Sequence, residues 1–176
     1  MTKRHHLLKI STLVSLMSVL TMNESYGALQ TATMPVQVTV VGHCTVSTNQ
    51  LTLSDYDPAQ VGATQTTATP ITVNCPNNEG YSIGLGVGVN STTFTNRKVV
   101  NPLNATLTYN LYKDNGFTQV WGDGSAGSTV LANQSGTGTP QNPIVYAQMT
   151  ASQSATVSGT AANNVYTDTV LVSINY

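Results

Sequence analysis

The chain has 176 residues and few charges, with six lysines and arginines against seven aspartates and glutamates. This balance excludes the basic surface that nucleic-acid binding requires. Only 7% of the residues are charged, and Thr, Ser, Asn and Gln supply most of the polarity. Such a surface tolerates close neighbours of its own kind, so the composition favours a protein that assembles.

The first 27 residues have the pattern of a secretory signal peptide. Basic residues precede an apolar run, residues 10–22, that is too short to span a bilayer. Cleavage after Gly27 satisfies the preference for small residues at the cleavage site. We therefore expect an exported mature chain, residues 28–176, which is one domain with a net charge of about −3. The alternative for residues 1–27 is a membrane-anchoring helix.

The mature chain is predicted to be all-β, because β-branched residues alternate with polar ones between turn residues and no stretch carries a helical stripe. The first alternating segment is residues 28–41. Its polar face consists of Pro35, Gln37 and Thr39. Its apolar face consists of Met34, Val36, Val38 and Val40.

Cys44 and Cys75 are the two cysteines of the chain, and both lie in the exported part. An oxidising compartment favours a disulfide between them. Cys75 shares the apolar face of Ile71 and Val73, so we expect the bridge to join neighbouring or facing strands. The mature chain adds one histidine, His43, and this set matches no zinc pattern. We expect no metal and no cofactor.

Further strands follow at intervals. Residues 81–89 place Tyr81, Ile83, Leu85, Val87 and Val89 on one face, and Gly84, Gly86 and Gly88 on the other leave room for a close neighbour. Other runs cover residues 105–113, 117–121, 143–150 and 154–158, with a short strand near 129–131. The last run aligns Tyr166, Val170, Val172, Ile174 and Tyr176. Many short strands with intervening turns indicate a β-sandwich.

The residues do not form a catalytic constellation. Ser125 lacks the glycine that a nucleophile elbow needs two residues earlier, and His43 is the one candidate base, so we expect no enzyme. Asp55 and Asp57 are interpreted as a solvated turn in preference to a calcium site. Trp121 either caps the core or stacks on a sugar. The second alternative predicts a secreted carbohydrate-binding or adhesive β-sandwich domain.

Several landmarks occur in a specific order over essentially the whole mature chain. They are Cys44-Thr-Val, Leu51-Thr-Leu-Ser-Asp-Tyr56-Asp-Pro58, Ile71-Thr-Val-Asn-Cys75, Tyr109-Asn-Leu-Tyr112, Trp121-Gly-Asp-Gly124 and Tyr166-Thr-Asp168 to Tyr176. In this order they resemble the spore-coat-U-like subunits of archaic, Csu-type chaperone-usher pili. The chain departs from that pattern at Leu53-Ser54, where the family usually has Phe-Gly, and at Asn164, where it has Gly.

The resemblance implies an incomplete immunoglobulin-like β-sandwich that is completed by donor-strand complementation. A periplasmic chaperone would first supply the missing strand, and an outer-membrane usher would then exchange it for the N-terminal segment of the next subunit. Residues 28–41 would be the donor segment and residues 42–176 the pilin domain. The acceptor groove and chaperone-binding surface would involve Val170, Val172, Ile174 and Tyr176.

The expected function is therefore that of a structural subunit, exported through the periplasm, that polymerises into a cell-surface pilus and supports adhesion and biofilm formation. Its expected partners are the chaperone, the usher and pilus subunits of the same or a related type. Neither a nucleic acid nor a small-molecule substrate is expected.

Overall fold

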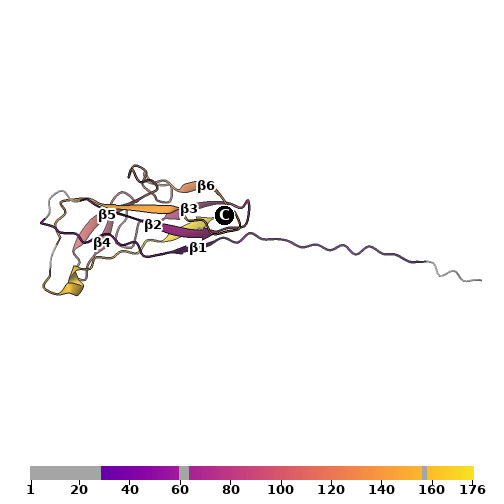
Figure 1. The fold of residues 1–176 in the computed structure, drawn as a ribbon, viewed down its shortest axis with the longest axis horizontal. Helices are drawn as coiled ribbons and strands as arrows, with labels where there is room; N and C mark the ends of the chain where they lie inside the picture. The colour runs from indigo at the N-terminus through magenta and orange to yellow at the C-terminus, as the bar shows by residue number, and fades with distance from the viewer. Residues whose placement is uncertain (1–28, 60–63, 156–157) are drawn as a thin grey trace, which may run out of the picture. The chain divides into compact units, whose positions relative to one another are not determined.

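The computed structural model describes residues 29–59, 64–155 and 158–176, so the predicted signal peptide lies outside the described residues. The described chain is all-β, as predicted. Its strands are β1 Thr45–Thr48, β2 Gln65–Asn74, β3 Gly80–Leu85, β4 Arg97–Val100, β5 Thr106–Tyr112, β6 Leu131–Ser135, β7 Ile144–Met149 and β8 Val172–Asn175, with one 3-10 helix, η1 Ala161–Asn164 (Figure 1). Thr39–Tyr176 form one compact unit. Over the described ranges, no helix has the length and apolarity to cross a membrane.

One sheet is antiparallel and five-stranded, in the order β1-β2-β7-β5-β4. β2 is long enough to pair with two neighbours in turn, with β7 through residues 65–70 and with β1 through residues 71–74. The predicted alternation is confirmed at its end, because the side chains of Ile71, Val73 and Cys75 are buried. Because β-branched side chains pack well on a pleated surface, this face forms the core side of the sheet.

The other sheet is three-stranded, in the order β6-β3-β8. β3 ends at Leu85, earlier than the predicted run to Val89. Gly88 has a φ of +91°, which glycine adopts without strain, and Val89 is exposed beyond it. The space left by the small residues is filled by the chain itself, since a Cβ on Gly84 would lie 2.9 Å from the Ser173 Oγ of β8.

Arg97 is fully buried and ties together several segments of the sandwich. Its Nε and Nη2 atoms donate to the Gly86 carbonyl oxygen at 3.0 and 2.8 Å, and Nη2 also donates to the Trp121 carbonyl oxygen at 2.7 Å. Nη1 donates to Asn110 Oδ1 at 2.7 Å and to the Phe94 carbonyl oxygen at 3.2 Å. The guanidinium is therefore hydrogen-bonded on all three nitrogens.

Some predicted strands are not formed as expected. Residues 117–121 make isolated bridges only, and Phe117 has a φ of +55°, which no regular strand contains. The described residues of 154–158 carry no strand. The strand predicted near 129–131 lies later, as β6. In these stretches turn geometry overrides the β-propensity of the sequence.

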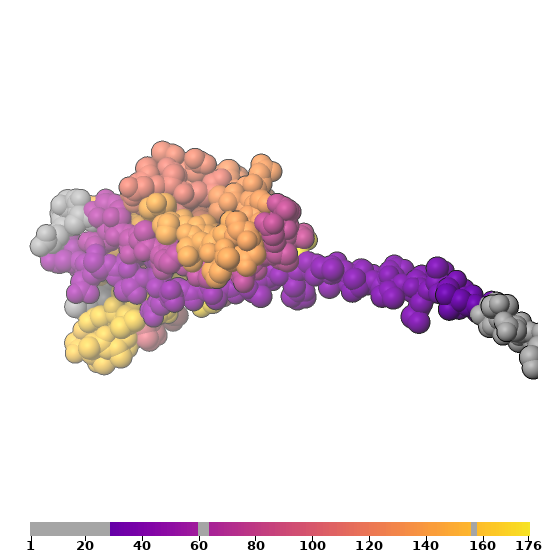
Figure 2. Space-filling view, turned by 45° about the vertical axis from the view of Figure 1, so that its right-hand side comes forward, coloured from indigo at the N-terminus to yellow at the C-terminus, as the bar shows by residue number. Residues whose placement is uncertain are grey.

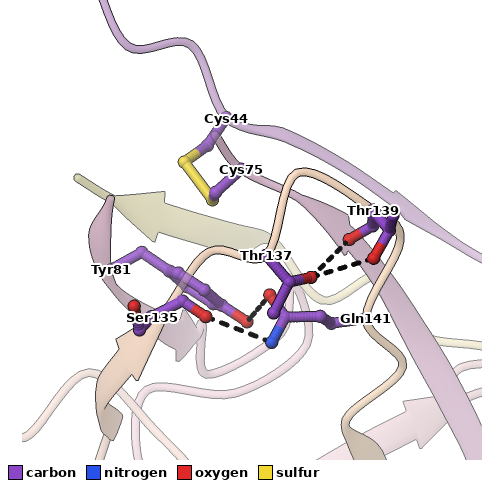
Figure 3. The surroundings of a disulfide bond; sticks show 7 residues. All are labelled: Cys44, Cys75, Tyr81, Ser135, Thr137, Thr139 and Gln141. Carbon is purple, nitrogen blue, oxygen red and sulfur yellow. Dashed lines mark hydrogen bonds between the residues drawn. A yellow bond between two sulfur atoms is a disulfide. The ribbon is translucent and has the colours of Figure 1, made fainter. Parts of the chain in front are cut away.

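The Cys44–Cys75 disulfide closes the open end of the β1–β2 ladder (Figure 3). Thr45 pairs with Asn74, and the two cysteines are the next residues outward. Of the two predicted arrangements, the bridge therefore joins neighbouring strands.

Replacing both cysteines with serine is expected to lower the free energy of unfolding by about 2–5 kcal/mol, because the unfolded chain is no longer cross-linked across 31 residues. Urea unfolding of the serine variant and of the oxidised chain measures this difference. Reduction of the unaltered chain should reproduce it. Equal urea midpoints for the oxidised chain and the variant would show that the bridge contributes no stability.

Candidate functional site

A groove with a volume of about 870 Å³ lies between the two sheets. One wall is formed by residues 48–56, from the last residue of β1 onward, and the other by residues 164–170 together with Val172, the first residue of β8. The floor is apolar and consists of Ile71, Leu85, Leu107, Leu111, Val145 and Met149. The groove thus reaches the hydrophobic core, although these floor residues are themselves buried.

Both walls adjoin edge strands. β1 pairs with β2 and β8 pairs with β3, and neither has a second partner among the described strands. Within the walls, Leu51 and Leu53 pack partly buried against the core although residues 49–57 carry no strand. An edge strand offers unpaired backbone N–H and C=O groups to an incoming strand.

The backbone groups of β8 alternate between two sides. Leu171 accepts a hydrogen bond from the Gly86 N–H at 2.8 Å, and Ser173 lies opposite Gly84 in the ladder. Odd-numbered residues therefore direct their N–H and C=O groups toward β3. The even-numbered residues direct their N–H and C=O groups toward the open edge instead. Their side chains point toward the core: Val170, Val172 and Ile174.

The four predicted acceptor residues occupy different places. Val170 and Val172 line the groove. Ile174, two residues after Val172 in β8, packs against the core. Tyr176 is 53% exposed, and its ring centroid lies 6.3 Å from that of His43. The structure thus brings the first three to one face and places Tyr176 at its end.

Each wall of the groove is held by a tyrosine hydroxyl. Tyr109 donates to Asp168 Oδ2 at 2.7 Å, and Asp168 Oδ1 accepts from the Val89 N–H at 3.0 Å. On the opposite wall, the Tyr56 hydroxyl donates to the Gln153 carbonyl oxygen at 2.7 Å and accepts from the Gln153 N–H at 2.6 Å. These hydrogen bonds fix both walls to the rest of the sandwich.

Sequence reasoning placed Tyr56, Tyr109 and Asp168 among the landmarks but gave them no role. The partners of the two tyrosines are 97 and 59 residues away in the chain, so no local pattern indicates these contacts. At Asn164, where the family usually has glycine, the side chain accepts from the Ser158 N–H at 2.7 Å. The side-chain amide of Asn164 therefore holds the loop by this hydrogen bond, and its backbone φ is not in the left-handed region.

Burial raises the pKa of Tyr109, and the hydrogen bond to Asp168 and its negative charge raise it further. The folded chain therefore holds this proton more tightly than the unfolded chain, in which tyrosine titrates near pH 10. The free energy of unfolding is thus expected to fall as the pH rises above about 10. Tyr81 and Tyr112 contribute in the same direction, because burial raises the pKa of each.

Replacing Tyr109 with phenylalanine is expected to reduce this alkaline loss of stability, since one titrating group with a raised pKa is removed. Near neutral pH the variant should be about 1–3 kcal/mol less stable, because Asp168 Oδ2 loses its donor. Unfolding by urea at a series of pH values from neutral to alkaline measures both effects. If the free energy of unfolding fell equally with pH in the two chains, the raised pKa of Tyr109 would be contradicted.

The predicted donor segment lies in an exposed stretch. Residues 29–41 carry no strand and run as an extended chain, drawn in indigo in Figure 2. Its four apolar side chains are exposed, Met34 to 84%, Val36 to 88%, Val38 to 82% and Val40 to 88%. A row of exposed apolar side chains on one face marks an interaction surface.

The residues of the alternative sites are placed differently. Trp121 is only 1% exposed, and its indole N–H donates to the Ile83 carbonyl oxygen at 2.9 Å. The ring therefore caps the core and presents no face to a sugar, which removes the residue on which the carbohydrate-binding alternative depended. Asp55 and Asp57 are both exposed, and Asp57 accepts from the Ala59 N–H at 2.9 Å in a turn.

Comparison with known proteins is consistent with this geometry. The Spore Coat Protein U domain family matches residues 30–173. A chain in the crystal structure of the CsuC-CsuE chaperone-tip adhesion subunit pre-assembly complex, from the archaic chaperone-usher Csu pili of Acinetobacter baumannii, has a similar fold. Its TM-score is 0.55 at 21% sequence identity, over 78% of the present chain and 41% of that chain. No curated protein matches the sequence.

Proposed function

This chain belongs to the Spore Coat Protein U domain family, and we propose that it is a structural subunit of a chaperone-usher pilus that polymerises by donor-strand exchange. The observation that carries the proposal is the pairing of an apolar groove beside the open edge of β8 with an exposed segment of matching alternation. Residues 28–41 of one copy occupy the groove of the next. The role is mechanical and requires no catalysis.

The energetics support this use of the segment. Main-chain hydrogen bonds to β8 supply affinity for any extended chain, and side chains inserted into the groove supply register. Burial of Met34, Val36, Val38 and Val40 contributes about 1.5–3 kcal/mol each, or about 6–12 kcal/mol before ordering costs. That sum is comparable to the stability of a domain, which is about 5–15 kcal/mol. The inserted strand is therefore part of the folded state of the subunit that receives it.

The apolar groove also gives a reason for a chaperone. A subunit with an unpaired edge at β8 and an apolar groove lined by the partly buried Val170 and Val172 risks aggregation on its way to the cell surface. A periplasmic chaperone covers the groove with a strand of its own, and an outer-membrane usher exchanges that strand for the donor segment of the next subunit. The resulting surface pilus supports adhesion and biofilm formation.

The test is deletion of residues 28–41 from the mature chain, co-expressed with its chaperone. We expect the chaperone complex to form as before, because the groove is intact, and assembly of the truncated copies into polymers to stop. Electrophoresis without boiling resolves the polymer ladder. Polymers of normal length from the truncated chain would overturn the proposal.

A second arm of the test omits the chaperone. The full mature chain is then expected to be unstable or to polymerise in the periplasm, since the groove is left uncovered. A stable, well-behaved monomer of residues 28–176 would count against donor-strand exchange.

A further inference from the structure

We propose that the free edge of β6 is closed to strand addition by a bulge at Asn133 and by the side-chain amides of Gln134 and Gln141. An extended segment of another copy can then add to the sandwich only beside β8. Residues 28–41 are that segment under the proposed function, on which this step rests. The closure of β6 itself concerns the folded domain alone.

The exposed segment makes every open sheet edge of this protein a hazard. Residues 29–41 carry exposed apolar side chains, and an edge with unpaired N–H and C=O groups accepts an extended chain through main-chain hydrogen bonds. Among the described strands, four lie at sheet edges: β1, β4, β6 and β8. β1 and β8 border the groove, so selective assembly requires that β4 and β6 be closed.

β4 is closed by another part of the chain. Val100 turns its backbone groups away from β5, and both are used there: its N–H donates to the Thr167 carbonyl oxygen at 2.9 Å, and its carbonyl oxygen accepts from the Thr167 N–H at 3.0 Å. Lys98, two residues earlier, turns its backbone groups to the same side. A lysine is one of the residues with which proteins protect an edge strand, because its charge resists burial beneath another strand.

β6 is interrupted by a bulge, in which two of its residues lie opposite one residue of β3. The register shifts between the pairs Tyr81–Gln134 and Ile83–Leu131. Within the bulge, Asn133 has a φ of +56°, a left-handed conformation that asparagine tolerates. A bulge bends its strand and leaves the extra residue unpaired, so a straight incoming strand meets no continuous row of donors and acceptors.

The carbonyl oxygens at this edge are already hydrogen-bonded. Because the even-numbered residues of β3 turn to β8, its odd-numbered residues turn to β6, and the carbonyl oxygens of Ala132 and Ser135 point to the free edge. Gln134 Nε2 donates to the Ala132 carbonyl oxygen at 2.8 Å, and Gln141 Nε2 donates to that of Ser135 at 3.2 Å (Figure 3). Gln141 is held there by two backbone hydrogen bonds to β2 and by the Tyr81 hydroxyl, which donates to its Oε1.

β8 differs from β6 in its regularity. Its residues Val172–Asn175 pair with β3 in unbroken register, and none of them has a positive φ. The backbone groups that β8 turns to the groove are therefore evenly spaced, as an added strand requires. The two edges of the same three-stranded sheet thus differ in their capacity to take another strand.

Deletion of Asn133 opens the edge without turning any other side chain of β6 around. With one residue fewer, Ala132 alone lies between Leu131 and Gln134, which keep their partners in β3 and their inward faces. Gln134 also loses the two-residue spacing from which its amide reaches the Ala132 carbonyl oxygen. The matched control is Asn133→Gly, which keeps the length of β6 and adopts a positive φ without strain.

The test uses purified pili of the full mature chain, because their grooves are already filled. Ser135→Cys places a thiol at the edge of β6, and a synthetic peptide of residues 30–41 carries Gln37→Cys. We expect the yield of the mixed disulfide to be at least about tenfold higher for pili with the deletion than for pili with Asn133 or Asn133→Gly. A small thiol reagent should label all three equally, which shows that the thiol is accessible throughout.

Equal yields from the three kinds of pili would overturn the closure of β6 and leave donor-strand exchange intact. If the deletion prevents folding, Gln134→Ala with Gln141→Ala frees both carbonyl oxygens and should raise the yield at least about threefold, and an unchanged yield would again overturn the closure. If the unaltered chain forms no pili, the proposed function fails. The Ser135→Cys thiol then reports the same edge in the unassembled full chain, where the same ratios decide.

Discussion

Replacing Val36 and Val38 with aspartate is expected to abolish assembly while leaving the fold of the subunit unchanged. Both side chains are exposed in the subunit, to 88% and 82%, so the substitutions remove no packing from the sandwich. In the assembled pilus the same side chains would lie in the apolar groove, where an unpaired carboxylate costs several kcal/mol. Two such groups should weaken assembly at least about a thousandfold, measured as the polymer fraction at a fixed subunit concentration.

The matched control uses the other face of the same segment. Aspartate at Gln37 and Thr39 adds the same charge within the same stretch, but on the side that points away from the core. Assembly of this variant should stay within about tenfold of the unaltered chain, since exposed charges contribute about 1 kcal/mol or less. Equal loss in both variants would show that charge, not insertion of the even-numbered side chains, governs assembly.

Replacing Arg97 with methionine is expected to lower the free energy of unfolding by about 3–5 kcal/mol. The side chain is fully buried, and its removal takes the donor from the carbonyl oxygens of Gly86 and Trp121, while Asn110 Oδ1 keeps the Leu111 N–H as a donor. Burial lowers the pKa of Arg97, while the negative charge of Asp168 and the nearby Tyr109 act in the opposite direction. Because arginine stays protonated in proteins, the cost of burial is offset mainly by its hydrogen bonds.

Lys98, the next residue of β4, supplies the control. It lies on the opposite face of the strand and is half-buried, so Lys98→Met should change the stability by less than about 1 kcal/mol. Urea unfolding of the two methionine variants beside the unaltered chain makes the comparison. Equal effects at the two positions would contradict a special role for the buried guanidinium.

The strands that sequence reasoning predicted well are those in which burial sets the alternation. The runs ending at Cys75, Leu111 and Met149 bury their apolar face fully, so the pattern of period two is visible in the sequence. Where local geometry dominates, the prediction was less accurate. The run predicted to continue to Val89 is broken by the positive φ of Gly88, beyond the end of β3 at Leu85. The positive φ of Phe117 breaks the run at 117–121, and β-propensity alone cannot indicate either break.

The structure also places contacts around the groove that the sequence did not indicate. Alternation identified the apolar faces of residues 28–41 and of the chain around β8, but the contacts that hold the groove walls join residues far apart in sequence. Arg97 illustrates this limit, since an arginine beside Lys98 gives no sign in the sequence that it will be buried among backbone carbonyls. The roles of the predicted donor and acceptor residues stay predictions until assembly is measured.

Amide hydrogen exchange at β8 tests the central claim most directly. In the subunit before assembly, the N–H groups of Val172 and Ile174 point to the open edge and should exchange rapidly, whereas that of Ser173 points to β3 and should be protected. On assembly, protection should appear at Val172 and Ile174 and stay at Ser173. Full protection of all three amides in the isolated subunit would show that the edge is already paired, and would contradict a fold completed by another copy.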